Sequence, residues 1–257
     1  MSDSGHVAFR VENRIATITF TRPEKKNAFT TAMYAQFTAA LREAEEDNHV
    51  RVVVLTGAGG DFSAGNDLKD FMGDPPTNGD APVFQLIRAL AFFGKPLLAA
   101  VEGVAVGIGS TMLLHCDLIY AGDGAKFVMP FVNLGVTPEA GSSLLLPKIV
   151  GMPMAMEMIL LGEKMDVAMA QQVGLINKIA MRGGALAVAM ADAEKIAEKP
   201  PGAVQAAKRL LREPIRQALG SVLQDEGATF VGCLGSPESE EAFTAFFGKR
   251  KPDFSAF

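Results

Sequence analysis

Apolar segments alternate with polar and glycine-rich segments along the first two thirds of the chain. Residues 7–20 alternate between polar and apolar side chains and then become apolar, which predicts a hairpin of two strands around Asn13-Arg14. Apolar side chains recur at helical spacing from Phe29 to Ala44, which predicts an amphipathic helix. A further apolar run predicts a buried strand at residues 52–56, and strands are also predicted at residues 97–101, 117–121 and 175–179. This alternation is typical of an α/β fold.

The pattern becomes helical from residue 184 onward. Helices are predicted at residues 186–198, 203–211, 215–230 and 237–247. The last of these begins with Ser236 as a capping residue and Pro237 at the first helical position. We therefore divide the chain into an α/β core, residues 1–198, and a helical region, residues 199–257. Strand-loop-helix units recur at uneven intervals in the core, which is compatible with a spiral α/β arrangement.

One apolar segment, residues 127–147, contains Glu139 as its only ionisable residue. Residues 126–129 predict a strand, and Thr137-Pro138-Glu139 predicts a helix start with a hydroxyl cap, a proline and an acid in the first turn. A lone carboxyl group among apolar side chains loses solvation, which raises its pKa and suits it to accept a proton near neutral pH. The alternative is that Glu139 lies at the surface and only complements the helix dipole.

Composition and charge narrow the classes of protein that fit the chain. The 257 residues are 49% hydrophobic and include 26 glycines, as in a globular enzyme with a large core. The formal net charge of −5 argues against nucleic-acid or anionic-membrane binding, which depends on lysine and arginine. Cys116 and Cys233 lie far apart, as expected of free thiols in a reducing compartment. Because the sequence shows no apolar run of about 20 residues and no signal peptide at residues 1–6, we expect a cytoplasmic protein.

Two glycine-rich loops offer main-chain donors rather than a nucleotide site. Gly57-Ala58-Gly59-Gly60 lacks the Lys-Ser/Thr of a phosphate-binding loop, and Gly107-Ile108-Gly109 is followed by Met112 where a dinucleotide-binding motif has its third glycine. Each loop follows a predicted strand and precedes a predicted helix, so N–H groups at the helix start lack intrahelical partners. Such groups could hold an oxyanion, or the glycines could serve only to form tight turns. The histidines are scattered, without the spacing of a triad or a metal site: His6, His49 and His115.

Four segments carry a family-specific pattern in one order along the chain. They are residues 22–28, 62–68, 103–117 and 247–254, the second reading Phe-Ser-Ala-Gly-Asn-Asp-Leu. Together they resemble the crotonase superfamily of enoyl-CoA hydratases and isomerases. The resemblance implies a crotonase-like spiral of ββα units with a C-terminal helical trimerisation region. It also implies an acyl-CoA thioester substrate and a homotrimer or hexamer.

The resemblance assigns roles to individual residues. It places an oxyanion hole on the main-chain N–H groups of Ala64 and Ile108. Lys25, Ala28 and the Lys249-Arg250-Lys251 cluster are candidates to bind the phosphates and adenine of coenzyme A, although the cluster is equally compatible with a solvated tail. No metal or separate cofactor is implied, because coenzyme A is part of the substrate. The thioester and the adenine end of coenzyme A are expected along Ala64, Gly65, Asn66, Asp67 and Leu68.

The sequence departs from the hydratase branch at both of its catalytic glutamates. The matching positions hold Thr111 and Phe131, so neither carboxylate is present, and Phe131 is expected to line the substrate instead. Water addition without paired acid/base groups is slow. The segment from Phe131 to Ser143 resembles the 3,2-trans-enoyl-CoA isomerase branch, whose single catalytic glutamate matches Glu139. Glu139 would therefore move a 3-enoyl-CoA double bond to the 2-trans position; a 2-enoyl-CoA hydratase and a non-catalytic acyl-CoA-binding protein are the alternatives.

Overall fold

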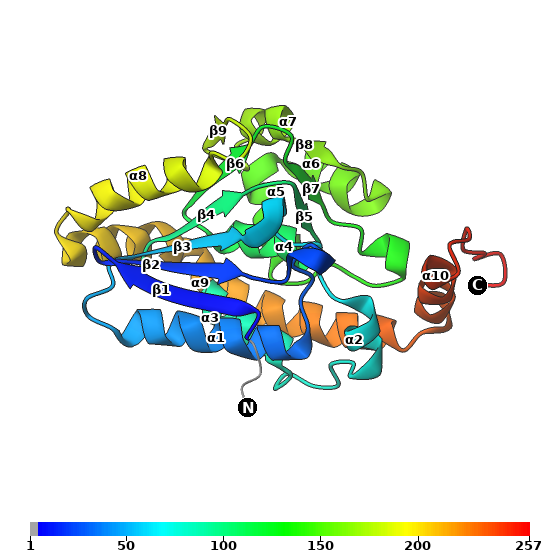
Figure 1. Ribbon diagram of the computed structural model, residues 1–257. Helices are drawn as coiled ribbons and strands as arrows, with labels where there is room; N and C mark the ends of the chain where they lie inside the picture. Colours follow the sequence, from blue (N-terminus) through cyan, green and yellow to red (C-terminus); the bar gives the residue numbers. More distant parts are fainter. Residues whose placement is uncertain (1–4) are drawn as a thin grey trace.

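The computed structural model describes residues 5–257. Residues 1–4, part of the N-terminal segment in which no signal peptide is predicted, lie outside the described residues. A large sheet has the strand order β1-β2-β3-β4-β6-β9 (Figure 1). β1 and β2 form the predicted antiparallel hairpin, with Asn13 and Arg14 at positive φ in its turn, and the other neighbours are parallel. The strands are β1 (Val7–Glu12), β2 (Ile15–Phe20), β3 (Val52–Gly57), β4 (Leu97–Val101), β6 (Leu118–Gly122) and β9 (Lys178–Ala180).

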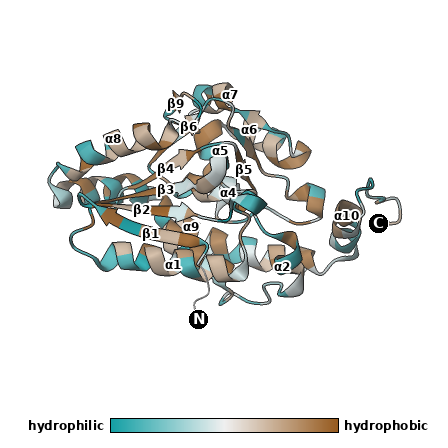
Figure 2. Cartoon of the chain, in the orientation of Figure 1, coloured by the Kyte–Doolittle hydropathy of each residue, from teal (hydrophilic) through white to brown (hydrophobic). Residues whose placement is uncertain are grey.

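The inner strands of the large sheet, β2, β3, β4 and β6, are buried on both faces, whereas the edge strands β1 and β9 are largely exposed. Alternate side chains of the inner strands belong to two separate hydrophobic core clusters, one on each face of the sheet, because successive side chains in a strand point to opposite faces. One face packs against α8 (Ala185–Ala197), which presents an alanine every four residues. The other face packs against α1 (Thr31–Glu46), α3 (Pro82–Ala91) and α5 (Ser142–Val150). In Figure 2 the central strands are mostly brown, whereas α1 and α8 mix brown and teal, as expected for amphipathic helices.

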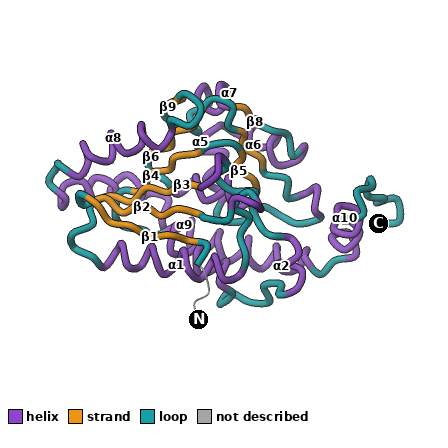
Figure 3. The backbone as a smooth tube through the Cα atoms, in the orientation of Figure 1, coloured by secondary structure: helices purple, strands orange, loops and turns teal. Residues whose placement is uncertain are grey.

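A second, small sheet lies next to the loops that follow the carboxyl ends of the large sheet's strands. It has the order β5-β7-β8, from β5 (Val104–Val106), β7 (Lys126–Val128) and β8 (Met165–Asp166). Figure 3 shows loops, in teal, gathered where the parallel strands β2 and β3 end. Two short helices follow loops at these strand ends: α2 (Leu68–Gly73) and α4 (Ile108–Thr111). Two further short helices come later in the chain, α6 (Met152–Met156) after α5 and α7 (Val167–Gln172) after β8.

The helix start predicted at Thr137-Pro138-Glu139 is wrong. α5 begins at Ser142, and the residues before it form a loop. Ala140 (φ 59°) and Gly141 (φ 72°) are left-handed, so the helix cannot extend back through them. The Thr137 hydroxyl is buried without a partner among the described residues and therefore caps nothing.

The C-terminal region is helical, as predicted, but two predicted helices are one. α9 (Pro201–Leu234) continues through Pro214 for 34 residues and packs against α3 and α5. α10 (Pro237–Phe247) begins as predicted, because the Ser236 hydroxyl accepts the Ser239 N–H. It lies at the edge of the molecule, away from the large sheet (Figure 1). The division at residue 198 stays a prediction, and within residues 5–257 no helix is both long and apolar enough to cross a bilayer.

Candidate active site

Two glycine-containing loops lie side by side at the carboxyl ends of β3 and β5. Ser63 joins them, since its N–H donates to Val104 O and its carbonyl accepts the Val106 N–H, both at 2.9 Å. Gly65 has φ +87°, and a Cβ atom there would lie 2.7 Å from Val106 O. Only glycine fits this position without displacing the backbone. The two loops named in the sequence analysis are therefore in direct contact.

The main-chain donors in these loops are not the pair that was predicted. The Ala64 N–H donates to Lys26 O at 2.9 Å, so it is not available to a ligand, and its assignment to an oxyanion hole is wrong. Asn66 and Phe29 lie opposite each other in an isolated β-bridge. In this bridge the Phe29 N–H donates to Gly65 O, and the Asp67 N–H donates to Phe29 O. The Asn66 N–H points away from that bridge and has no acceptor within residues 5–257.

Ile108 provides the second unpaired donor. It is the first residue of α4, where N–H groups lack intrahelical acceptors, and its N–H has none elsewhere in the described chain. Gly107 before it has φ +53°, which turns the chain from β5 into α4. Asn66 and Ile108 line the same small cavity. The structure thus supplies one free donor from each loop.

Glu139 lies in that cavity and is 6% exposed. Its Oε1 accepts the Thr111 hydroxyl at 2.5 Å, and its Oε2 has no partner among the described residues. Burial raises the pKa of Glu139 to about 8; the Thr111 hydrogen bond opposes this rise, and the negative charge of Glu226 adds to it. The burial excludes a surface carboxylate that only complements a helix dipole, and the raised pKa would suit Glu139 to accept a proton near neutral pH.

Tyr34 is a polar residue of the cavity that sequence reasoning missed. Its hydroxyl donates to Asn66 Oδ1. Burial, and then the negative charges of Glu139 and Asp70, hold its pKa well above the usual value, so it stays protonated. The available signal was a tyrosine on the buried side of the helix predicted from Phe29. The remaining walls are apolar: Phe71, Val83, Phe84, Ile87 and Phe230.

The other predicted substrate residues lie outside this cavity. Asp67 caps α2 and pairs with Arg22 at 2.8 Å, and Leu68 is the first residue of α2. Ala28 and Phe131 are buried, and Lys25 and Lys249 are exposed. Their roles toward coenzyme A stay predictions. In the cluster around Lys249, Arg250 is held by both carboxylate oxygens of Glu241.

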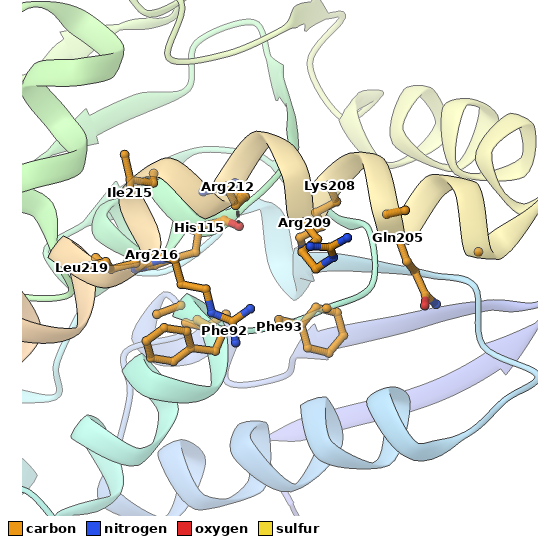
Figure 4. A pocket seen from close by; sticks show the side chains of 15 residues that line it. Phe92, Phe93, His115, Gln205, Lys208, Arg209, Arg212, Ile215, Arg216 and Leu219 are labelled. Carbon is orange, nitrogen blue, oxygen red and sulfur yellow. Dashed lines mark hydrogen bonds between the residues drawn. The ribbon is translucent and has the colours of Figure 1, made fainter.

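A larger cavity of about 370 Å³ lies between the end of α3 and α9 (Figure 4). Its partly buried cations are engaged within the protein. Lys208 pairs with Asp117 at 2.8 Å, and Arg212 donates to the carbonyls of Leu114, His115 and Cys116. These contacts tie α9 to the start of β6. The cavity shares no residue with the one around Glu139, and within the described residues no group of three His, Cys, Asp or Glu could hold a metal.

Comparison with known proteins identifies the family. Residues 10–256 match the sequence profile of a family described as enoyl-CoA hydratase/isomerase. The chain belongs to the enoyl-CoA hydratase/isomerase family. This finding confirms the resemblance to the crotonase superfamily.

Solved and curated members of the enoyl-CoA hydratase/isomerase family cover nearly the whole chain. An enoyl-CoA hydratase/isomerase from Pseudoalteromonas atlantica T6c superposes with a TM-score of 0.93 at 37% identity, covering 97% of this chain and 100% of that one. The predicted crotonase-like fold with a helical C-terminal region is thereby confirmed. The 2,3-dehydroadipyl-CoA hydratase of Escherichia coli (strain K12) is 36% identical, over 95% of this chain and 96% of its own. Enoyl-CoA delta isomerase 2 of Rattus norvegicus is also 36% identical, over 94% of this chain and 63% of its own.

Proposed function

We propose that the protein is an acyl-CoA double-bond isomerase that converts 3-enoyl-CoA esters to 2-trans-enoyl-CoA esters. The observation that carries the proposal is one buried carboxyl group, Glu139, in a cavity with two unpaired main-chain donors, Asn66 and Ile108. The similarity to enoyl-CoA delta isomerase 2 supports it.

The reaction needs only a base and an oxyanion hole. The proton on C2 of a 3-enoyl thioester is acidified by the carbonyl and by the double bond. Glu139 Oε2 removes it, and the electron pair moves toward the thioester oxygen to form a dienolate. The N–H groups of Asn66 and Ile108 stabilise the negative oxygen; each such donor contributes about 3 kcal/mol to transition-state stabilisation. The carboxyl group then returns the proton to C4, and the double bond lies between C2 and C3.

No cofactor enters this scheme, because these groups supply the whole proton transfer. Coenzyme A takes part as the thioester portion of the substrate. The cavity beside Glu139 has a volume of about 10 Å³, so the acyl chain enters only when wall side chains such as Phe84 and Phe230 turn aside. These residues come from α3 and α9, which makes the contact between the two helices the expected entry route for the acyl chain.

The hydratase alternative lacks a second acid/base group. The Thr111 hydroxyl is bound to Glu139, and Phe131 is a buried hydrocarbon side chain that cannot position water. The family also contains hydratases, such as the Escherichia coli (strain K12) protein above. The distinction therefore requires a direct assay.

A panel of thioesters tests the proposal. We expect conversion of 3-hexenoyl-CoA to 2-trans-hexenoyl-CoA, followed by absorbance of the conjugated thioester, and little hydration of crotonyl-CoA. Rapid hydration of crotonyl-CoA with slow isomerisation would instead establish a hydratase. Tight binding of acyl-CoA esters without turnover of any of them would establish a binding protein.

The pH profile provides a second prediction. Only the carboxylate form of Glu139 can accept a proton, and burial raises its pKa to about 8. We therefore expect kcat/KM for 3-hexenoyl-CoA to rise with pH by about tenfold per unit below the pKa and to level off above it. Initial rates measured from about pH 6 to pH 9 check this, and a profile that is flat over that range contradicts it.

A trimer or hexamer is part of the proposal. Leu210 and Leu211 on α9 are 63% and 81% exposed in the single chain. Neighbouring leucines this exposed on one helix are expected to be covered in an assembly.

A further inference from the structure

Glu226 is a buried carboxylate that the proposed reaction does not use. It lies on α9 and is 9% exposed. Its Oε2 accepts the Gly141 N–H at 2.5 Å, and its Oε1 accepts the Ser143 N–H at 2.8 Å. Both donors belong to the segment that directly follows Glu139. One side chain from α9 thus holds the loop of the base at two points.

The loop needs such support because its backbone is strained. Ala140 and Gly141 are consecutive left-handed residues, and Ala140 carries a Cβ that disfavours this conformation. The Gly141 and Ser143 N–H groups are also at the start of α5, where a negative charge is favourable. Glu226 therefore stabilises both the turn and the N-terminus of the helix after it.

A second contact holds the same turn through a different main-chain atom. His115 Nε2 lies 2.7 Å from Ala140 O, and burial lowers the pKa of His115 to about 4. The neutral ring donates this hydrogen bond at pH 7. A Cβ atom built on Gly141 would lie 2.5 Å from Leu219 Cδ1 of α9, so the turn packs closely against that helix.

The charge of Glu226 has no compensating cation. Within residues 5–257 no lysine, arginine or histidine forms an ion pair with it. The charged residues on the helices packed beside it are Arg88 on α3 and Lys148 on α5, both in the last turns of their helices. On α9 itself, the adjacent Asp225 is exposed. Burial raises the pKa of Glu226, and its hydrogen bonds from Ser143 and Gly141 oppose that rise.

The groups around Glu139 show where this charge acts. After burial, the negative charge of Glu226 contributes to the raised pKa of Glu139. Tyr34 from α1 stays protonated, and Asp70 from α2 acts on Tyr34. His115 from the turn after α4 is neutral. Among residues 5–257, Glu226 is therefore the one negative group that both contacts the loop of the base and acts on its carboxyl group.

We propose that Glu226 is a positioning residue that fixes Glu139 by holding the Ala140–Gly141 turn through two main-chain hydrogen bonds. The inference deepens the proposed function and rests on Glu139 being the acid/base group. A carboxylate on α9 with only a packing role would stabilise the fold but would leave the titration of Glu139 unchanged.

The test compares Glu226→Gln with a matched control, Asp225→Asn. Glutamine keeps one acceptor oxygen but loses the second hydrogen bond and the charge. Asparagine at the exposed neighbouring position removes an equal charge without touching the loop. The first measurement is the titration of Glu139 in each variant without substrate, monitored by infrared difference spectra against Glu139→Gln. The second is kcat for 3-hexenoyl-CoA together with the Kd of hexanoyl-CoA.

In Glu226→Gln we expect the pKa of Glu139 to fall, kcat to fall about 10- to 100-fold and Kd to change less than about twofold. Asp225→Asn should match the wild type. An unchanged Glu139 titration, or a kcat no lower than that of Asp225→Asn, would overturn the inference. The substrate-free titration separates the two claims, because it gives an answer even if the wild type does not isomerise 3-enoyl esters.

A second variant covers the case in which Glu226→Gln does not fold. Glu226→Asp keeps the charge but shortens the side chain, so the two hydrogen bonds lengthen. We expect the pKa of Glu139 to stay raised while kcat falls about tenfold. A wild-type kcat in this variant would overturn the positioning role.

Discussion

Replacing Glu139 with glutamine is expected to lower kcat for 3-hexenoyl-CoA by about 10²- to 10⁴-fold, the usual contribution of a general base. Glutamine has the shape of the protonated carboxyl group, and its oxygen can still accept the Thr111 hydroxyl. Because a pKa of about 8 keeps Glu139 largely protonated at pH 7, the buried site already accommodates a neutral side chain. The variant should therefore fold normally and lose only the ability to accept a proton.

The measurements for this variant are initial rates and the Kd of hexanoyl-CoA. The Kd should remain within about twofold of the wild-type value, because the main-chain donors and the apolar walls are unchanged. Glu163→Gln, at an exposed residue in the loop just before β8, provides the control for removal of a carboxylate. Isomerisation by Glu139→Gln at the wild-type rate would show that another group carries the proton.

Gly65→Ala is expected to reduce both stability and activity. An alanine at φ +87° is strained, and its Cβ would lie 2.7 Å from Val106 O, so the two loops must separate. The strain should lower the free energy of unfolding by about 1–3 kcal/mol. Displacement of the adjacent Asn66 N–H should lower kcat/KM by about 10²- to 10³-fold, as for loss of an oxyanion donor.

Gly60→Ala isolates the effect of the loop contact. Gly60 also has φ +87°, but a Cβ atom there meets nothing within 4 Å. Both variants share the backbone strain, so only Gly65→Ala should lose most of its activity. Thermal unfolding and steady-state rates of the two proteins test this, and equal activity losses would contradict the assigned role of the loop contact.

The sequence predicted correctly those elements whose geometry depends on residues adjacent in the chain. Asn13-Arg14 adopts the positive φ values of a tight hairpin, and Ser236 caps α10. The helix start predicted at Thr137 fails because Ala140 is held in a left-handed conformation. The groups that hold it, His115 and Glu226, lie far away in sequence. Such long-range contacts leave no local pattern.

The candidate site shows the same division. Glu139 stands out in the sequence as the only ionisable residue of an apolar segment, and its burial follows from that composition. The direction of a main-chain N–H, however, depends on which strand its neighbours pair with. Pairing with Lys26 occupies Ala64, and the bridge to Phe29 leaves Asn66 free. Neither pairing can be read from the loop sequence alone.

The hydrogen bond from Thr111 to Glu139 has a stereochemical consequence. With Oε1 held, removal and return of the hydrogen both take place at one atom, Oε2. That atom reaches a planar dienolate from one side, so the 1,3-shift is suprafacial. A deuterium atom taken from C2 would arrive at C4 on the face it left, to the extent that the buried carboxyl group does not first exchange it with solvent.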